Sequence, residues 1–502
     1  MRADTVIGAM ESAMLTRPGP DSSIASRLRA ADVDTMARIA FGLLCLGFAI
    51  GFFVFPTYPN YDSYYSLLWG REVLDLESPF FEGFRVPTEH PLGIVAGGLL
   101  ALLGEVGDRV WVAMTLTSFL ALVWAVYRLG RIAFTPLVGA IAAALLLTRF
   151  DFAFLAARGY IDVPYMALVV WAAAMEAQRP RRGWPVFVLL ALAGLLRPEA
   201  WVLAGLYFLW MSLHATWGER VRYALLAAIG PGLWAATDFA VTGDPLFSLH
   251  YTSSSAEELG RQRTLSEIPS ALPTFFGSLV KVPVLIGSVA GIVIAAIVTP
   301  RKMAMPLMLL VSGIGTFVLV GIAGLSVIER YLIVAALALL VFAAVALGGF
   351  SMLRPGRVRT AWIAAAGLLV AYGVFFTVTH VNVNRFENEL RFRGEAHVAL
   401  SQILHEPQVQ AGLRCGPLTV PNHKLVPDSR WILDLGRDRV LARADPDVAA
   451  SATKGVALYV TSRFALFKHA FTNSADDAMI QVPPAGWRRV ATSDFYAAYV
   501  NC

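Results

Sequence analysis

Residues 331–350 read YLIVAALALLVFAAVALGGF and contain no charged side chain. An α-helix of this length is about 30 Å long, which matches the hydrocarbon core of a bilayer. The run is followed by Arg354, Arg357 and Arg359, and clusters of this kind mark the cytoplasmic ends of membrane helices. This stretch therefore predicts a transmembrane helix.

The same pattern recurs along the whole chain of 502 residues. Hydrophobic residues make up 57% of the sequence and charged residues 15%, whereas soluble domains carry about 25% charged residues. The mean hydropathy of +0.61 indicates many spans rather than a single anchor. The net charge of +5 comes from short basic clusters between apolar runs, so it reflects membrane topology and not nucleic-acid binding.

Apolar runs of about 17–25 residues, oriented by the Lys and Arg that flank them, predict about eleven membrane spans. The spans are expected at residues 37–55, 110–129, 132–148, 163–177, 184–196, 200–217, 223–241, 284–298, 304–324, 331–350 and 361–379. A further apolar run, Pro91–Gly104, is too short to span and is predicted to lie on the membrane surface. With this count every basic cluster falls on the side of the N-terminus, which is therefore predicted to be cytoplasmic.

These spans divide the chain into three parts. We expect a cytoplasmic tail (1–36), a transmembrane domain (37–379) with outer loops at 56–108, 150–162 and 242–283, and an extracytoplasmic C-terminal domain (380–502). The tail lacks the layout of a cleaved signal peptide. The last domain contains strand-like runs such as Val456–Val460 and Ala497–Val500. The predicted fold class is an all-α polytopic membrane protein with a small C-terminal α/β domain.

Two of the three cysteines, Cys415 and Cys502, lie in this last domain, and Cys45 lies in an apolar run. None of them has metal-ligand spacing. An extracytoplasmic location allows Cys415 and Cys502 to form a disulfide, which would stabilise the domain by about 4–5 kcal/mol in the loop-entropy model. The alternative is that they are two unrelated thiols.

The first outer loop places Asp62 just after the first span, among tyrosines. A carboxylate at the membrane–water boundary can act as a general base toward an acceptor hydroxyl, which typically accelerates a reaction about 10²–10⁴-fold. The alternative is an N-cap or turn aspartate in an aromatic interfacial belt.

The second outer loop carries Arg158 and Asp162, four residues apart. On one helix these side chains would share a face and could pair with each other. Alternatively, Asp162 orients a donor or acceptor while Arg158 faces a phosphate.

Two further arginines lie at the outer ends of predicted spans. Arg197, with Pro198 and Glu199, interrupts a long apolar stretch, and charges at membrane depth need a partner or a cavity. Arg197 and Glu199 either form a mutual ion pair, or Glu199 fixes Arg197 at a donor phosphate. Arg330 either neutralises a phosphate leaving group or snorkels to the interface beside Glu329.

Taken together, these segments resemble the GT-C glycosyltransferases, especially the branch of protein O-mannosyltransferases and bacterial lipid-linked sugar transferases. Asp62 matches the aspartate that the family carries after its first span. Glu89-His90-Pro91-Leu92 looks like its His-Pro-Pro or His-Lys-Pro element, although the second proline is absent. Arg158 with Asp162 fits the family's second outer loop, and the segments around Arg197 and Arg330 are similar to bacterial members. The resemblance covers about residues 37–350.

The resemblance implies an inverting transfer of a sugar from a polyprenyl-phosphate donor to a glycan, lipid or protein acceptor on the outer face of the membrane. Asp62 would be the general base, although Ser63 departs from the Asp-Glu pair of many relatives. The residues that would contact donor or acceptor are Glu89, His90, Arg158, Asp162, Arg197, Glu199 and Arg330. No cofactor is implied; a divalent metal fits the family but is not indicated here, because the outer loops lack a clear Asp-x-Asp. Mannose and arabinose donors both fit.

A multi-span transporter or a lipid-linked sugar flippase is the main alternative. Transporters often contain internal repeats with paired broken helices. This sequence has one broken segment, around Pro198, without a matching partner. The Ala/Arg-rich texture indicates a bacterium, so the predicted location is the cytoplasmic (inner) membrane.

Overall fold

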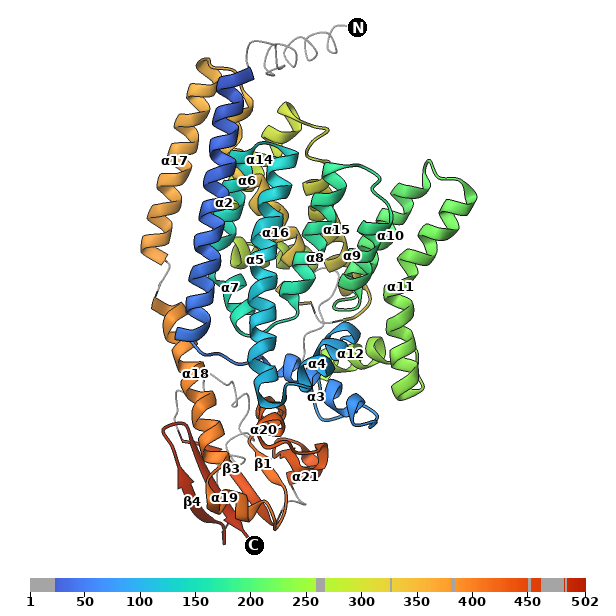
Figure 1. The fold of residues 1–502 in the computed structure, drawn as a ribbon, viewed down its shortest axis with the longest axis vertical. Coiled ribbons are helices and arrows are strands. Elements are labelled where there is room, and N and C mark those ends of the chain that lie inside the picture. The colour runs from blue at the N-terminus through green and yellow to red at the C-terminus, as the bar shows by residue number, and fades with distance from the viewer. Residues whose placement is uncertain are drawn as a thin grey trace.

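The computed structural model describes residues 23–258, 267–325, 327–380, 384–449, 453–461, 483 and 485–502, with no side-chain detail for 23–32 and 449. The first 22 residues of the predicted tail lie outside this part. The molecule is an elongated bundle of helices with a small domain that contains a β-sheet at one end (Figure 1). This confirms a mostly helical protein with a small C-terminal sheet.

A helix corresponds to each predicted span. These helices are α2 (Ser23–Val54), α5 (Gly107–Ala133), α6 (Pro136–Leu147), α8 (Asp162–Gln178), α9 (Trp184–Gly194), α10 (Glu199–Ser212), α11 (Trp217–Thr242), α14 (Val282–Val298), α15 (Ala304–Ile322), α16 (Ile333–Gly348) and α17 (Arg357–His380). By length and composition, six helices in the described part of the chain can cross a membrane, or up to eight if each bent pair is one span. The chain is therefore polytopic by this criterion, while the count of eleven stays a prediction.

Two spans are bent where the sequence predicts straight helices or loops. Helix α6 continues into α7 (Phe150–Ala157) at an angle of 65°. Helix α13 (Ile268–Val280) meets α14 at 108°, and the junction residue Lys281 has a positive φ of 67°. Each break turns a short helix sideways at the end of the bundle that carries the sheet domain.

Helix α16, which contains most of residues 331–350, is the core of the bundle and not a lipid-facing span. Of its most apolar window 94% is buried, compared with 0% for α2 and 6% for α17. Helix α14 packs very close to it, since a Cβ atom on Gly291 would lie 1.8 Å from the Phe342 carbonyl oxygen. Ser288 Oγ also donates to the Leu339 carbonyl, at 2.8 Å. Small residues at such crossings allow helix backbones to approach in membranes.

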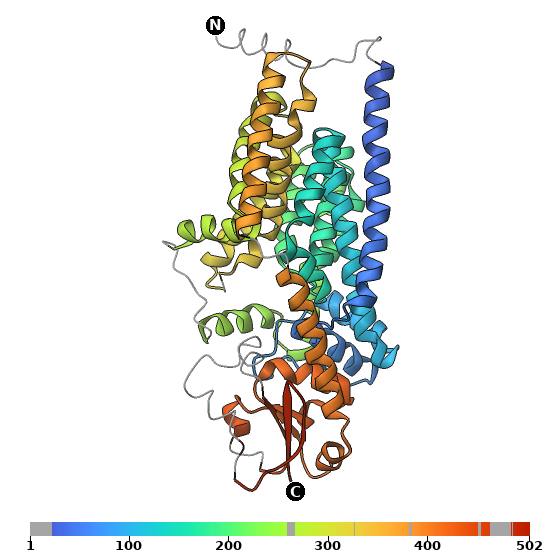
Figure 2. The same ribbon diagram turned by 90° about the vertical axis from the view of Figure 1, so that its left-hand side faces the viewer.

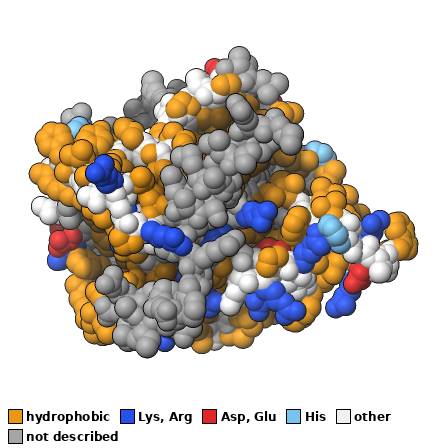
Figure 3. Space-filling model, turned by 90° about the horizontal axis from the view of Figure 1, so that it is seen from above, with side chains coloured by type: hydrophobic (Ala, Val, Ile, Leu, Met, Phe, Trp, Pro, Cys, Tyr) orange, Lys and Arg blue, Asp and Glu red, His pale blue; other side chains and the backbone are white. Residues whose placement is uncertain are grey.

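The basic clusters that flank the predicted spans lie at one end of the bundle, opposite the sheet domain (Figures 1 and 2). They flank the turns between α8 and α9, α10 and α11, α14 and α15, and α16 and α17. Seen from this end, Lys and Arg side chains outnumber Asp and Glu (Figure 3).

Short helices form a layer between the bundle and the sheet domain (Figure 2). They are α3 (Tyr61–Leu74), α4 (Pro91–Ala101), α12 (Phe247–Glu258) and α13, with the 3₁₀ turns η1 (Gly104–Val106) and η2 (Glu329–Leu332). Helix α4 coincides with the predicted surface helix, and its 11 residues are too few to span a bilayer. Helix α3 crosses it closely, because a Cβ atom on Gly97 would lie 2.1 Å from the Ser66 carbonyl oxygen.

The C-terminal domain begins with α18 (Asn384–Leu404) and is organised around five strands. Its other elements are α19 (Pro407–Gly412), β1 (Leu418–Val420), η4 (His423–Leu425), α20 (Val426–Leu433), η5 (Arg437–Arg439), β2 (Val440–Ala442), α21 (Pro446–Ala449), β3 (Gly455–Val460), β4 (Arg488–Thr492) and β5 (Tyr496–Asn501). One further 3₁₀ turn, η3 (Gly349–Met352), belongs to the bundle and precedes α17. The sheet order is β2-β1-β3-β5-β4, with β1 parallel to β2 and β3, and β5 antiparallel to β3 and β4. The two strand-like runs read from the sequence lie in β3 and β5, which pair with Val456 opposite Val500.

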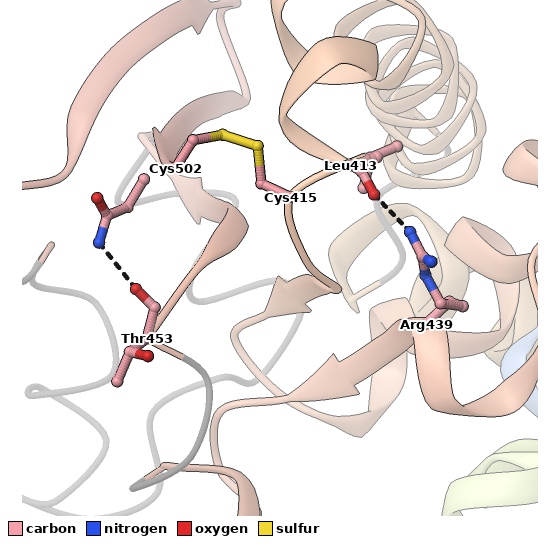
Figure 4. The surroundings of a disulfide bond; sticks show 6 residues. Leu413, Cys415, Arg439, Thr453 and Cys502 are labelled. Carbon is pink, nitrogen blue, oxygen red and sulfur yellow. Dashed lines mark hydrogen bonds between the residues drawn. A yellow bond between two sulfur atoms is a disulfide. The ribbon is translucent and has the colours of Figure 1, made fainter.

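Cys415 and Cys502 form the disulfide that the sequence allows, with Cα atoms 5.5 Å apart (Figure 4). The bond joins the end of β5 to the turn before β1 across 87 residues of sequence. Closing so long a loop restricts the unfolded chain, and the entropy model gives about 4–5 kcal/mol. Cys45 is free.

The sheet domain is docked on α3 through buried contacts. Arg430 of α20 forms an ion pair with Glu72 of α3 at 2.7 Å, and both side chains are less than 10% exposed. His397 of α18 stacks on Tyr58 with ring centroids 4.2 Å apart. These contacts fix the domain beside the first outer loop.

Candidate active site

A cluster of charged side chains lies where the bundle meets the layer of short helices. Arg197 donates to Asp162 from Nη1 and to Glu199 from Nε at 2.9 Å. Arg330 donates to the other side of Asp162, from Nη2 to Oδ2 at 2.7 Å. One carboxylate thus holds two guanidinium groups that come from the α9–α10 turn and from η2.

Asp62 is the fifth acidic or basic group of this cluster. Its Oδ2 lies 3.7 Å from Nη1 of Arg330, and its side chain is 12% exposed, compared with 0% for Asp162. Arg330, at 31% exposed, is the most accessible member. Asp62 and Arg330 are therefore the two groups that a substrate can approach.

Hydrogen bonds between two outer loops position Asp62. The Asn60 backbone N–H donates to the Arg158 carbonyl at 2.7 Å, and Ser63 Oγ donates to the Gly159 carbonyl at 2.6 Å. Asn60 also caps α3, since its side chain accepts from the Ser63 N–H at 2.9 Å. Asp62 is therefore not the N-cap, which was one alternative for it, and its carboxylate is free of that role.

The environments of the two aspartates push their pKa values apart. Burial raises the pKa of Asp162, but Arg330 and Arg197 outweigh this effect and hold it well below its usual range. Burial also raises the pKa of Asp62. Arg330 lowers this pKa, but the charge of Asp162 raises it further, so the pKa of Asp62 stays above its usual value. Such a division is typical of sites in which one carboxylate is a fixed anion and the other exchanges a proton.

Arg158 is not part of this cluster, and its pairing with Asp162 on one helix is wrong. Helix α7 ends at Ala157 and α8 begins at Asp162, because Gly159 between them has a φ of 69° and breaks the helix. Arg158 instead donates to the Tyr58 carbonyl at 2.9 Å and lies over the Tyr58 ring. Its observed contacts brace the first outer loop.

Glu89 lies beside the cluster in a separate buried network. It accepts from Trp234 Nε1 at 3.0 Å and from Ser248, which also bonds Asp238. Burial and the hydrogen bond to Asp238 raise the pKa of Glu89 to about 8. Glu89 therefore carries a proton near neutral pH and ties the first outer loop to α11 and α12.

His90 lies between the charged cluster and the network around Glu89, and it directly precedes α4. Burial and the charges of Arg197 and Arg330 lower its pKa to about 3, so the imidazole is neutral at physiological pH. Its Nδ1 atom is buried and lacks a hydrogen-bond partner among the described residues. A neutral imidazole can donate or accept one hydrogen bond from a substrate but offers no charge.

An apolar cavity of about 390 Å³ opens next to the charged cluster. Its walls come from α4, α5, α8 and α9, and it is lined by Leu92, Trp111, Met114, Ile161, Leu168 and Leu196, among others. Several lining residues adjoin charged ones in the sequence, as Ile161 adjoins Asp162 and Leu196 adjoins Arg197. One end of the cavity therefore lies at the level of the charged cluster, although none of the cluster's side chains lines it.

Several residues of this region were not singled out from the sequence. Asp238, Trp234 and Ser248 surround Glu89, and Tyr58 holds Arg158. An aspartate in the apolar stretch of α11 is the one signal that could have indicated Asp238, because charges are costly there. Among the described residues, no group of three or more His, Cys, Asp and Glu side chains is arranged to hold a metal ion.

Comparison with known proteins finds similarity in structure but not in sequence. No protein-family model and no curated protein sequence matches the chain. The crystal structure of ArnT from Cupriavidus metallidurans bound to undecaprenyl phosphate is similar, with a TM-score of 0.50, 13% identity, and coverage of 92% of this chain and 98% of that one. The oligosaccharyltransferase of Archaeoglobus fulgidus in its apo form has a TM-score of 0.43 at 12% identity, over 77% of this chain and 60% of that one.

The first of these structures shows the fold of this chain. The chain shares the fold of the ArnT structure, in agreement with the membrane glycosyltransferase fold that the sequence resemblance implied. At 13% identity this likeness shows the fold, and the activity must be argued from the residues of this chain.

Proposed function

We propose that the chain is a membrane glycosyltransferase that transfers a sugar from a polyprenyl-phosphate donor to a glycan, lipid or protein acceptor of the cell envelope. The observation that carries this proposal is the position of Asp62, Asp162, Arg197 and Arg330 at the level of one end of an apolar cavity. A donor with a hydrocarbon tail and a charged phosphate needs both features side by side. The ligand bound in the similar ArnT structure, undecaprenyl phosphate, has this chemistry.

The donor would bind with the first part of its lipid chain in the cavity and its phosphate at Arg330. A volume of about 390 Å³ holds only part of a polyprenyl chain, so the remainder would lie in the bilayer. Arg330 is accessible and is fixed by Asp162 at 2.7 Å. Arg197 lies deeper, with 8% of its side chain exposed, and would add to the positive electrostatic potential at the phosphate. Glu199 would hold Arg197 in place. His90 can add one hydrogen bond.

The reaction would begin when Asp62 takes the proton of the acceptor hydroxyl. The acceptor oxygen then attacks the anomeric carbon as the bond from that carbon to the phosphate oxygen breaks, and the phosphate leaves with the electron pair. Attack from the face opposite the phosphate inverts the anomeric configuration. Arg330 stabilises the charge that develops on the leaving phosphate, as preorganised cations do in other transfer reactions. The raised pKa of Asp62 suits a general base, whose strength increases with its pKa.

The orientation of the protein in the membrane is proposed from its basic clusters. The basic clusters lie at the far end of the bundle, so the positive-inside rule puts that end in the cytoplasm and the site on the outer face. The protein would lie in a bacterial inner membrane, where its C-terminal domain with the Cys415–Cys502 disulfide would be outside. A glycan, lipid or protein acceptor could then approach between this domain and α3.

The proposal is tested by sugar transfer with purified full-length protein in lipid, using polyprenyl-phosphate arabinose and polyprenyl-phosphate mannose as donors. We expect transfer by the wild type and a loss of about 10²–10⁴-fold in Asp62→Asn. Asp75→Asn, at the exposed far end of the same helix, is the matched control and should be active. The donor that is used identifies the sugar.

Other outcomes would change the assignment. Equal transfer by wild type and Asp62→Asn would keep the class of enzyme and remove Asp62 as the base. If neither donor supports transfer but the protein moves a labelled polyprenyl-phosphate sugar across a vesicle membrane, the proposal of a glycosyltransferase is contradicted and a flippase is favoured. Inversion is checked by the anomeric configuration of the product.

A further inference from the structure

A second cavity lies at the opposite end of the bundle from the candidate active site. It has a volume of about 200 Å³ and is enclosed by α8, α9, α10 and α15. Asp162 begins α8, and the cavity is lined on this helix from Val169 to Glu176, so its Glu176 end lies about 20 Å along the helix from Asp162. The lining is apolar apart from Glu176, with Ala172, Val186, Leu203 and Met308 among its members.

Glu176 is bound to the protein and does not act as a free anionic group in this cavity. Its carboxylate accepts from Tyr207 Oη at 2.9 Å and from Trp210 Nε1 at 3.1 Å. The backbone N–H groups of Arg181 and Arg182 donate to it at 2.6 Å and 3.1 Å. Because these donors satisfy both oxygens, Glu176 has little capacity for a cationic ligand.

The same bonds hold Arg181 at the entrance of the cavity. Arg181 has a φ of 59°, a conformation that is uncommon outside glycine, and the carboxylate of Glu176 fixes its N–H there. Its guanidinium carbon lies 4.8 Å from the ring centre of Trp210, which itself lines the cavity. Its Nη2 is 2.5 Å from His214 Nδ1, while its Nε is buried and lacks a partner among the described residues.

The surroundings of this entrance are basic on one side and apolar on the other. Arg179 and Arg182 flank Arg181, and Arg301 and Lys302 precede α15. Figure 3 looks onto this end and shows mostly Lys and Arg among its charged groups. Trp210 and Met308 line the cavity and are 39% and 41% exposed, so the cavity opens toward the side of the bundle that faces lipid.

We propose that this cavity binds one acyl chain of a membrane phospholipid with an anionic headgroup, whose phosphate contacts Arg181. The volume of about 200 Å³ is below the 300–1,000 Å³ that is usual for drug-sized ligands, which suits part of a single hydrocarbon chain. Anionic lipids are attracted to Lys and Arg at the ends of membrane helices. This site is distinct from the donor site and does not depend on the proposed activity.

The test compares two phospholipids that differ only in their headgroups. Purified full-length protein in detergent is titrated with phosphatidylglycerol or with phosphatidylcholine of the same chains, and bound lipid is counted by native mass spectrometry. The wild type should bind phosphatidylglycerol more tightly. Arg181→Gln should weaken phosphatidylglycerol about fivefold, which corresponds to about 1 kcal/mol for one arginine at an anionic headgroup. It should weaken phosphatidylcholine less, because the choline cation already offsets the charge of its phosphate.

Two more variants separate a specific site from a generally basic surface. Met308→Trp places a larger side chain in the cavity at a partly exposed position and should weaken both lipids; it also carries the test if Arg181→Gln does not fold. Arg357→Gln is the matched control, because Arg357 begins α17 at the same end of the bundle but on its other side (Figure 1). Equal binding of the two lipids by the wild type, equal losses in the two arginine variants, or full binding by Met308→Trp would overturn the proposal.

Discussion

Replacing Asp162 with asparagine removes the carboxylate that Arg197 and Arg330 share, and we expect it to lower the free energy of unfolding by about 3–5 kcal/mol. The Asp162 side chain is 0% exposed and that of Arg197 is 8% exposed, so water cannot replace the lost partner of Arg197. Arg330 is 31% exposed and can turn toward solvent, so its share of the loss is smaller. Three hydrogen bonds from the two arginines end on this carboxylate. At about 1.5–3 kcal/mol each their sum exceeds this range, but two of them come from the more accessible Arg330 and contribute less.

The effect should depend on pH in a defined direction. The pKa of Asp162 is lowered in the folded protein from an ordinary value of 3.8. Its contribution to stability is therefore complete above about pH 4 and is lost as the pH falls through the lowered folded pKa. The difference between wild type and Asp162→Asn should be constant near neutral pH and shrink only in strong acid.

The assay is unfolding of the purified proteins by a denaturing detergent, followed by the loss of helical circular dichroism. Asp434→Asn is the matched control, because Asp434 also pairs with an arginine, Arg71, but is 83% exposed. Exposed pairs contribute less than about 1 kcal/mol. If Asp162→Asn is no less stable than Asp434→Asn, the argument that burial makes this network essential to the fold is refuted.

Three further predictions concern other parts of the molecule. The pKa of Glu89 is about 8 in the fold and 4.5 in the unfolded chain, so its stabilising effect is complete below pH 4.5 and is lost as the pH rises through about 8. The melting temperature of the wild type should therefore fall over this pH range, and Glu89→Gln should make the fall smaller. A pH profile of Glu89→Gln parallel to that of the wild type would contradict the raised pKa of Glu89. Cys502→Ser should lower the stability of the C-terminal domain by about 4–5 kcal/mol or less, and reduction of the Cys415–Cys502 bond in the wild type should have the same effect on melting temperature. Arg430→Leu leaves Glu72 buried without its partner, which should cost about 3–5 kcal/mol and speed proteolysis of this domain; unchanged cleavage would argue against the docking contact.

Much of the helical architecture could be predicted because hydrophobicity is a local property. A run such as residues 331–350 predicts a helix of membrane length wherever it lies in the fold. The start of the short helix at Pro91 and the strands β3 and β5 were also readable from local patterns. The breaks at α6–α7 and α13–α14 were not, since they depend on how short segments pack at the end of the bundle.

The candidate site was predictable in its residue types but not in its pairings. Asp62, Asp162, Arg197, Glu199 and Arg330 lie at helix ends that the topology puts on one side, and the structure brings them together. Spacing alone suggested that Arg158 pairs with Asp162.

By itself, the sequence determined that the chain is helical, apolar and polytopic, and which ends of its helices carry charge. Only the tertiary structure decided that α16 is buried, that Asp162 joins Arg197 to Arg330, and that an apolar cavity ends at the level of this cluster. The physical reason is the distance in sequence over which the interactions act. Helix formation and partition into a membrane depend on neighbouring residues. An ion pair between residues 162 and 330 depends on the packing of helices that are distant in the sequence, which no local pattern encodes.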